Sequence, residues 1–196
     1  MVAIVTTDVS GPRAIIIHGY SATPLDHWFG WLADRLERSG FQATVPALPT
    51  PENPDSIEWT DAVSAAVGET DEATMVVAHS LGCLATLRHL KGLRRPWRLG
   101  SLVLVAGFLK PLPALPELDT FIGDGCDVSG IADRVDVLTV LRSDTDAYVP
   151  VEFTDGLAEK LGTKARVAPG RGHFLGSDGV CALPEVLDST IPRHLE

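Results

Sequence analysis

The chain has 196 residues, which is enough for one domain with a sizeable hydrophobic core. Apolar residues make up 45% of it, and the formal net charge is −10 at pH 7. This acidic balance argues against a nucleic-acid-binding protein and against attachment to an anionic membrane surface. No stretch approaches 18 uninterrupted apolar residues, so we expect no membrane span. From the chain length we expect residues 1–196 to form a single domain.

The three cysteines are Cys83, Cys126 and Cys181, which are odd in number and far apart in the sequence. They form no C-x-x-C pair, so we expect neither a disulfide framework nor a zinc site. Residues 1–13 lack the basic start and the long apolar run of a signal peptide. Together these features favour a reducing compartment, and we predict a cytoplasmic protein.

Short apolar runs alternate with amphipathic segments along the chain. The first run, RAIIIHGY at 13–20, is rich in β-branched residues and is typical of a buried strand. In the next segment, 24–40, apolar residues recur at helical spacing. The same alternation predicts further strands at 41–48, 73–79, 99–108, 135–143 and 163–170, and further helices at 56–69, 81–93, 150–162 and 183–196.

Strands that alternate with helices indicate an α/β fold, with about six mainly parallel strands flanked by helices. Segment 109–130 interrupts the pattern, because it is rich in Pro, Gly and Asp but carries scattered apolar residues. We expect it to be a short insertion over the site, and no large lid. In such folds the working groups lie beyond the carboxyl ends of the strands. The loops that matter are therefore 18–24, 78–82, 108–130, 143–150 and 170–178.

Ser80 stands at the junction between the strand predicted at 73–79 and the helix that follows it. Small residues flank it, with Ala78 before and Gly82 after. Small residues at this spacing allow a sharp turn and the close approach of another segment. The pattern is typical of a nucleophile elbow, in which a strand turns abruptly into a helix and presents a serine. A serine in this place is also a common helix cap, so the motif needs support from elsewhere.

That support comes from two further loops of the predicted sheet. A serine nucleophile needs a general base, for which histidine is suited, and a carboxylate that orients the imidazole. His173 follows the strand at 163–170, and Asp146 follows the strand at 135–143. Alone, His173 could be a packing residue and Asp146 a turn or helix-cap residue. Together with Ser80 they appear in the order Ser, Asp, His that α/β-hydrolases share, and this favours catalysis.

The loop SDTDAYVP offers two carboxylates, Asp144 and Asp146. Pro150 is favoured in the first turn of a helix, so we expect the next helix to begin there. Asp146 precedes it closely and is better placed to reach the loop of His173. Asp144 lies nearer the end of the strand, and we expect it to accept hydrogen bonds from backbone N–H groups of the turn.

The remaining candidate side chains have structural interpretations. A side chain next to the elbow serine points elsewhere, so we expect His79 to be a structural hydrogen-bonding residue. We expect His18 to pack beneath the oxyanion loop, and His27 and His89 to lie on helices without a catalytic role. Cys83 falls within the helix after Ser80 and is expected to be a small buried apolar residue rather than a nucleophile.

The whole set of motifs resembles one known family. HGY, HWFGWL, VAHSLGC, GFLKPLPALPELDTF, SDTDAYVP and GHFL stand in the order found in the small serine hydrolases of the YdeN and retinoblastoma-binding-protein-9 type. These form a compact branch of the α/β-hydrolase superfamily. The resemblance runs through nearly the whole chain. It implies a triad of Ser80, His173 and Asp146, with an oxyanion hole from the backbone N–H groups of Tyr20 and Leu81. The superfamily rule G-x-S-x-G is broken at Ala78, which this branch tolerates.

The sequence therefore predicts a carboxylesterase-like serine hydrolase that cleaves an ester or related acyl bond through an acyl-serine intermediate. The expected partner is a small acyl-ester or amide substrate, with no metal or organic cofactor, and the expected state is a monomer or a small homo-oligomer. Two alternatives stay open. One is a protein-interaction module on a hydrolase scaffold, since fold alone does not fix function. The other is a peptidase or acyl transferase that uses the same triad.

Overall fold

The computed structural model describes residues 11–190, and six strands within them form one parallel sheet of order β2-β1-β3-β4-β5-β6. The strands are β1 (Arg13–Ile17), β2 (Gln42–Thr44), β3 (Thr74–His79), β4 (Leu99–Val105), β5 (Val135–Arg142) and β6 (Arg166–Val167). The expected α/β fold with about six mainly parallel strands is confirmed.

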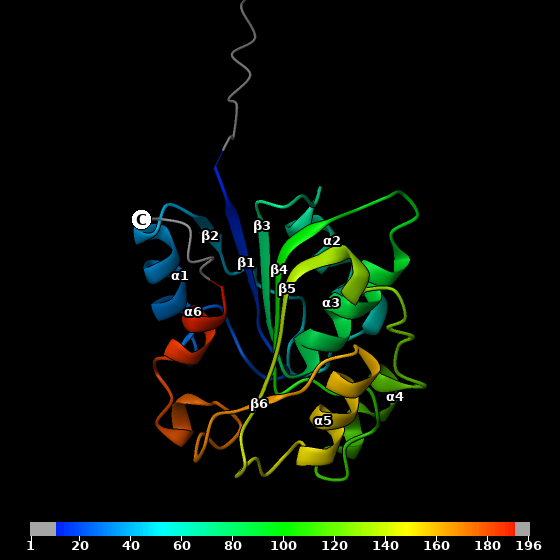
Figure 1. Cartoon of the computed structure of the whole chain (residues 1–196). Helices are drawn as coiled ribbons and strands as arrows, with labels where there is room; N and C mark the ends of the chain where they lie inside the picture. The colour runs from blue at the N-terminus through cyan, green and yellow to red at the C-terminus, as the bar shows by residue number, and fades with distance from the viewer. Residues whose placement is uncertain (1–10, 191–196) are drawn as a thin grey trace, which may run out of the picture.

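Helices cover both faces of this sheet (Figure 1). They are α1 (Phe29–Arg38), α2 (Ser56–Val67), α3 (Leu81–Gly92), α4 (Asp119–Ile122), α5 (Val151–Lys160) and α6 (Pro184–Thr190). Side chains alternate along each strand, so β1 directs Ile15 and Ile17 toward the core under α2 and α3, and Ala14 and Ile16 toward the core under α1 and α6. Of the helices between residues 11 and 190, none has both the length and the apolar character needed to cross a membrane.

Three elements are shorter than the sequence predicts by five residues or more. The helix expected at 24–40 begins only at Phe29. Before it, the N–H and Oγ1 of Thr23 donate to the Asp26 carboxylate at 2.6 and 2.8 Å, and His27 has a φ of 55°, which a helix does not allow. The strands expected at 41–48 and 163–170 shrink to β2 and β6. Both are edge strands that soon reach a proline, which has no N–H to donate. The end of the helix expected at 183–196 falls outside the described residues beyond Thr190.

Segment 109–130 packs against the core as a fixed wall. It contains a 3₁₀ turn and the short helix α4, and its apolar side chains join the core beneath α2 and α3. The Arg88 guanidinium of α3 donates to the carbonyl oxygens of Phe121 and Ile122 at 2.9 and 2.7 Å. The Phe121 ring also meets Trp59 of α2 edge-on, with centroids 5.4 Å apart. These contacts hold the segment to two helices of the core.

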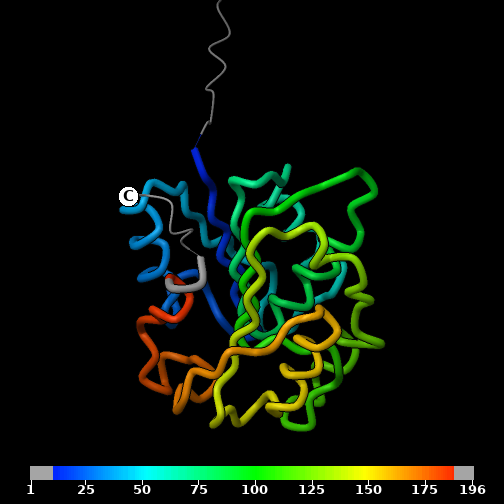
Figure 2. Tube along the Cα trace, viewed as in Figure 1, coloured from blue at the N-terminus to red at the C-terminus, as the bar shows by residue number. Residues whose placement is uncertain are grey.

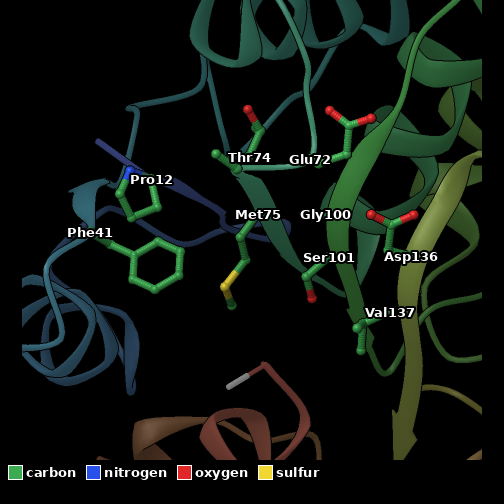
Figure 3. A pocket seen from close by; sticks show the side chains of 10 residues that line it. Pro12, Phe41, Glu72, Thr74, Met75, Gly100, Ser101, Asp136 and Val137 are labelled. Carbon is green, nitrogen blue, oxygen red and sulfur yellow. The ribbon is translucent and has the colours of Figure 1, made fainter. Parts of the chain in front are cut away.

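The two ends of the sheet differ in chemistry. At the amino ends of the strands lies a hollow of about 360 Å³, lined by Phe41, Met75, Ser101 and their neighbours (Figure 3). None of the described residues that line this hollow is a histidine, lysine or arginine. Ser80, Asp146 and His173 all follow the carboxyl ends of strands. Figure 2 traces the orange segment between β6 and α6, which carries His173.

Candidate active site

Ser80 joins β3 to α3 through a sharp turn. Its φ of 52° and ψ of −123° lie in a region that residues other than glycine rarely adopt. The N–H of Ser80 donates to the carbonyl oxygen of Val105 in β4 at 2.8 Å, which holds the turn against the sheet. This is the strained strand-to-helix geometry of a nucleophile elbow.

Two glycines let the loop after β1 pass close to this elbow. A Cβ on Gly19 would lie 3.0 Å from the Cβ of Ser80. A Cβ on Gly82 would meet the carbonyl oxygen of His18 and would lie 2.9 Å from Cγ2 of Ile17. Ala78, where the superfamily carries glycine, is fully buried in β3 and is accommodated there. The backbone crossing therefore requires a glycine at position 82 and accepts a methyl group at position 78.

We expect Gly82→Ala to destabilise the protein by about 1–3 kcal/mol, because the new methyl group meets backbone that cannot move away cheaply. For a chain of this size, Tm should fall by roughly 2–10 °C in thermal unfolding. The matched control is Gly92→Ala at the end of the same helix, where a Cβ would meet nothing within 4 Å. The control should leave Tm unchanged or raise it, and an equal loss in both variants would contradict the crossing argument.

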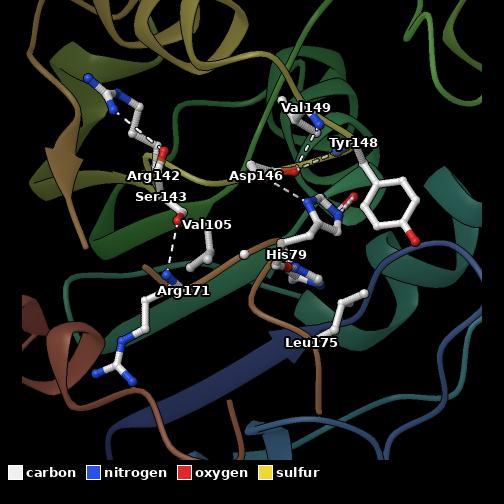
Figure 4. A network of polar contacts seen from close by, with 12 residues as sticks. His79, Val105, Arg142, Ser143, Asp146, Tyr148, Val149, Arg171 and Leu175 are labelled. Atoms are coloured by element: carbon white, nitrogen blue, oxygen red, sulfur yellow. Dashed lines mark hydrogen bonds and ion pairs between the residues drawn. The ribbon is translucent and has the colours of Figure 1, made fainter. Parts of the chain in front are cut away.

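A chain of hydrogen bonds links Ser80, His173 and Asp146. Nδ1 of His173 lies 2.8 Å from Oδ2 of Asp146, whose hydrogen bonds Figure 4 shows as dashed lines. Nε2 of His173 lies 2.9 Å from Oγ of Ser80. A carboxylate accepts only, so the Nδ1–H of His173 donates to Asp146 and Nε2 is left to accept from the serine hydroxyl. The second carboxylate oxygen accepts the N–H groups of Tyr148 and Val149, both at 2.9 Å. The side chains of His173 and Asp146 are 8% and 4% exposed, so solvent screens this pair little.

Asp144 makes a different contact. Its Oδ1 accepts the N–H of Gly170 at 2.7 Å, so its partner is a backbone group, as expected, but one on the loop of His173 rather than in its own turn. Ser143 accepts the N–H of Arg171 at 3.1 Å in the same way, and Thr145 accepts that of Gly172 at 3.1 Å. The loop after β5 thus fixes the course of the loop that carries His173. The sequence analysis did not predict this contact between loops.

Two side chains hold the backbone of His173 itself. The fully buried His79 donates its Nε2–H to the carbonyl oxygen of His173 at 2.9 Å. Asp178 accepts the N–H groups of His173 and Leu175 at 2.8 and 3.1 Å. Burial holds the pKa of His79 well below its ordinary value, so this ring stays neutral. The expectation that His79 is a structural hydrogen-bonding residue is confirmed, whereas the role of Asp178 was missed.

The other histidines and Cys83 can be placed as well. His18 is buried, and its Nε2 accepts the N–H of Leu48 at 3.0 Å. His89 is buried within α3, as expected. Burial raises the pKa of the Cys83 thiol, which disfavours the reactive thiolate. The expectation for His27 was wrong, because this residue precedes α1 in a left-handed conformation and lines the cavity at Ser80.

A cavity of about 300 Å³ opens beside Ser80 and His173. The remaining residues that line it are Tyr20, Ser21, His27, Leu115, Tyr148 and Leu175. Leu115 belongs to segment 109–130. The Tyr148 ring meets the imidazole of His173 edge-on, with centroids 5.3 Å apart. Among residues 11–190, no group of three or more His, Cys, Asp or Glu side chains is arranged to hold a metal ion.

The backbone donors expected for an oxyanion belong to Tyr20, in the loop after β1, and to Leu81, directly after Ser80. Leu81 is the first residue of α3, so its N–H has no partner within the helix. The N–H of Tyr20 donates to no other residue in the described part of the chain. Tyr20 follows Gly19, whose missing side chain brings that loop next to Ser80.

The family model for serine hydrolases matches residues 14–190. The chain belongs to the serine hydrolase family. This hydrolase is 39% identical to YdeN of Bacillus subtilis (strain 168) over 176 residues, which cover 90% of this chain and 93% of YdeN. The crystal structure of the B. subtilis ydeN gene product has a TM-score of 0.85 to it, covering 90% of this chain and 95% of that one.

More distant structures share the fold of this hydrolase. Est1E from Butyrivibrio proteoclasticus has a TM-score of 0.63 at 14% identity, covering 91% of this chain and 88% of Est1E. A carboxylesterase of the thaumarchaeon Nitrososphaera gargenis has a TM-score of 0.66 at 11% identity, covering 92% and 89% of the two chains. The family assignment makes the protein an α/β hydrolase, and its expected character as an enzyme is confirmed.

Proposed function

We propose that this protein hydrolyses esters or related acyl compounds through an acyl-serine intermediate formed on Ser80. The observation that carries the proposal is the unbroken path from the Ser80 hydroxyl through the His173 imidazole to the Asp146 carboxylate, with both contacts under 3 Å. In this arrangement each group has the partner that its role requires.

In the first step, Oγ of Ser80 attacks the carbonyl carbon of the substrate while its proton passes to Nε2 of His173. Asp146 keeps the Nδ1–H of His173 in place and stabilises the imidazolium as it forms. The N–H groups of Tyr20 and Leu81 would bind the negative oxygen of the tetrahedral intermediate. When the intermediate collapses, the bond to the leaving alcohol breaks and His173 returns the proton to it. A water molecule then repeats the sequence on the acyl-serine and releases the acid.

A fluorophosphonate probe tests this proposal directly, because it reacts with a serine that is activated as a nucleophile. We expect one adduct on the intact protein, located on Ser80 by peptide mass spectrometry. Labelling should disappear in His173→Ala, which lacks the base. A folded wild-type protein that takes up no probe would instead favour an interaction module on a hydrolase scaffold.

We expect short acyl chains, of about two to six carbons, to be the best substrates. The cavity holds about 300 Å³, and we propose that Leu115 of segment 109–130 forms a fixed part of its wall. Each further methylene gains only ~0.8 kcal/mol, and only where it finds apolar wall to contact. The measurement is kcat/KM for p-nitrophenyl esters of increasing chain length, with aminopeptidase substrates beside them. A maximum at long chains, or faster cleavage of the amides, would contradict this assignment.

A further inference from the structure

His27 forms part of the wall of the catalytic cavity, although the proposed reaction gives it no role. It adopts a left-handed conformation with a φ of 55° immediately before α1. Its ring meets those of Phe29 and His79 edge-on, with centroids 5.3 and 5.9 Å away. These aromatic contacts fix the orientation of the imidazole.

The two ring nitrogens of His27 are in different situations. The N–H of Gly176 donates to Nδ1 at 2.9 Å, so Nδ1 must carry a lone pair. Burial lowers the pKa of His27 below its ordinary value, which keeps the ring neutral at pH 7. A neutral imidazole has one N–H, and with Nδ1 accepting, that hydrogen is on Nε2.

This Nε2–H is not used within the described protein. It donates to no residue between 11 and 190, and it is not among the enclosed polar atoms that lack a partner there. Nε2 is therefore accessible, and the ring that carries it lines the cavity at Ser80. The lining of this cavity also includes the apolar side chains of Leu115 and Leu175, so polar groups form only part of its wall. Pockets of this kind use a few placed polar groups to orient a ligand.

We propose that His27 binds substrate by donating its Nε2–H to an acceptor oxygen other than that of the scissile carbonyl. This inference rests on the proposed esterase function and narrows it. The preferred substrates carry an ether, hydroxyl or second carbonyl oxygen close to the bond that is cleaved. The competing explanation is that His27 only holds Gly176 and with it the loop of His173.

Two substitutions separate these roles. In His27→Asn the side-chain oxygen replaces Nδ1 as the acceptor for Gly176, and asparagine tolerates a left-handed backbone, but the Nε2–H is lost. In His27→Gln an amide N–H can lie near the position of Nε2, while the acceptor for Gly176 is lost. His27→Asn therefore keeps the structural contact with Gly176, and His27→Gln keeps the donor for the substrate.

The assay compares substrates that differ by one atom. p-Nitrophenyl methoxyacetate and butyrate exchange an ether oxygen for a methylene on the acyl side. 2-Methoxyethyl butyrate and n-butyl butyrate do the same on the alcohol side. We expect His27→Asn to lower kcat/KM for the ether member of one pair about three- to tenfold more than for its methylene partner, the range of one hydrogen bond. His27→Gln should keep the wild-type ratio within about twofold.

The results that would contradict the inference differ from those that would contradict the proposed function. If His27→Asn changes both members of both pairs equally, His27 only holds the loop and the inference is overturned. If His27→Asn does not fold, His27→Gln decides alone, because loss of the wild-type ether selectivity in that variant contradicts the inference. If the wild-type protein neither takes up the fluorophosphonate nor cleaves any of the four esters, both the proposed function and the inference are contradicted. If the wild-type protein is labelled and active, but His27→Asn leaves the ratio of kcat/KM between ether and methylene esters unchanged, only the inference is contradicted.

Discussion

Replacing Ser80 with alanine is expected to lower kcat by about 10⁶, because it removes the hydroxyl on which the proposed acyl intermediate forms, 2.9 Å from Nε2 of His173. The fold should survive the change. The turn at Ser80 is held by its backbone N–H, and its hydroxyl makes one hydrogen bond, worth about 1 kcal/mol. The measurements are kcat with a short p-nitrophenyl ester and Tm for the same preparations.

Cys83→Ala is the matched control for this experiment, since it removes the thiol that lies three residues after Ser80 in α3. Its sulfur is fully buried, and its S–H donates to the carbonyl oxygen of Ala78 at 3.2 Å. We expect Cys83→Ala to keep most of the activity. If Ser80→Ala retained a tenth of the rate while Cys83→Ala abolished it, Ser80 would not be the nucleophile.

Asp146→Asn is expected to preserve the fold and to lower kcat by about 10³–10⁴. The asparagine oxygen can still accept the N–H groups of Tyr148 and Val149. Its amide N–H₂ would face Nδ1 of His173, so the imidazole would keep its hydrogen on Nε2. In that tautomer Nε2 cannot accept the proton of Ser80. The test is kcat of the variant with one ester at one pH.

Asp144→Asn is the matched control for Asp146→Asn. Asp144 lies two residues away and accepts the N–H of Gly170, which an asparagine oxygen can also do. We expect a loss of less than about tenfold, the value of one hydrogen bond. A larger loss for Asp144→Asn than for Asp146→Asn would mean that the orienting carboxylate was wrongly assigned.

The class of fold and the order of its elements could be predicted from the amino-acid pattern alone. Buried strands such as β1 and β3 are recognisable because a parallel strand covered on both faces is a nearly continuous apolar run. The elbow at Ser80 is recognisable because its sharp turn and close crossing demand small neighbours. The expected Ser80, Asp146 and His173 come from this local chemistry and from their order, and as catalytic residues they stay a prediction.

The ends of the helices and strands, and the contacts between loops, could not be predicted in this way, because they depend on packing in the folded chain. The helix expected from residue 24 begins at Phe29, because the turn at Thr23 and Asp26 forms hydrogen bonds that compete with a helix. His27 thereby leaves the helix and lines the cavity beside Ser80 and His173. The spacing of apolar residues could not predict this start of α1. Such spacing does not show where side-chain hydrogen bonds of a turn replace those of a helix.

The contacts that hold His173 also come from the tertiary structure alone. Ser80 and His173 are 93 residues apart, and His79 and His173 are 94 apart. The loop carrying Ser143, Asp144 and Thr145 bonds to the backbone of the His173 loop. A local pattern specifies which residues can form a strand or a turn, because those depend on near neighbours along the chain. Which side chain finds which distant backbone group depends on how all the loops pack at one edge of the sheet, and only the folded chain decides that.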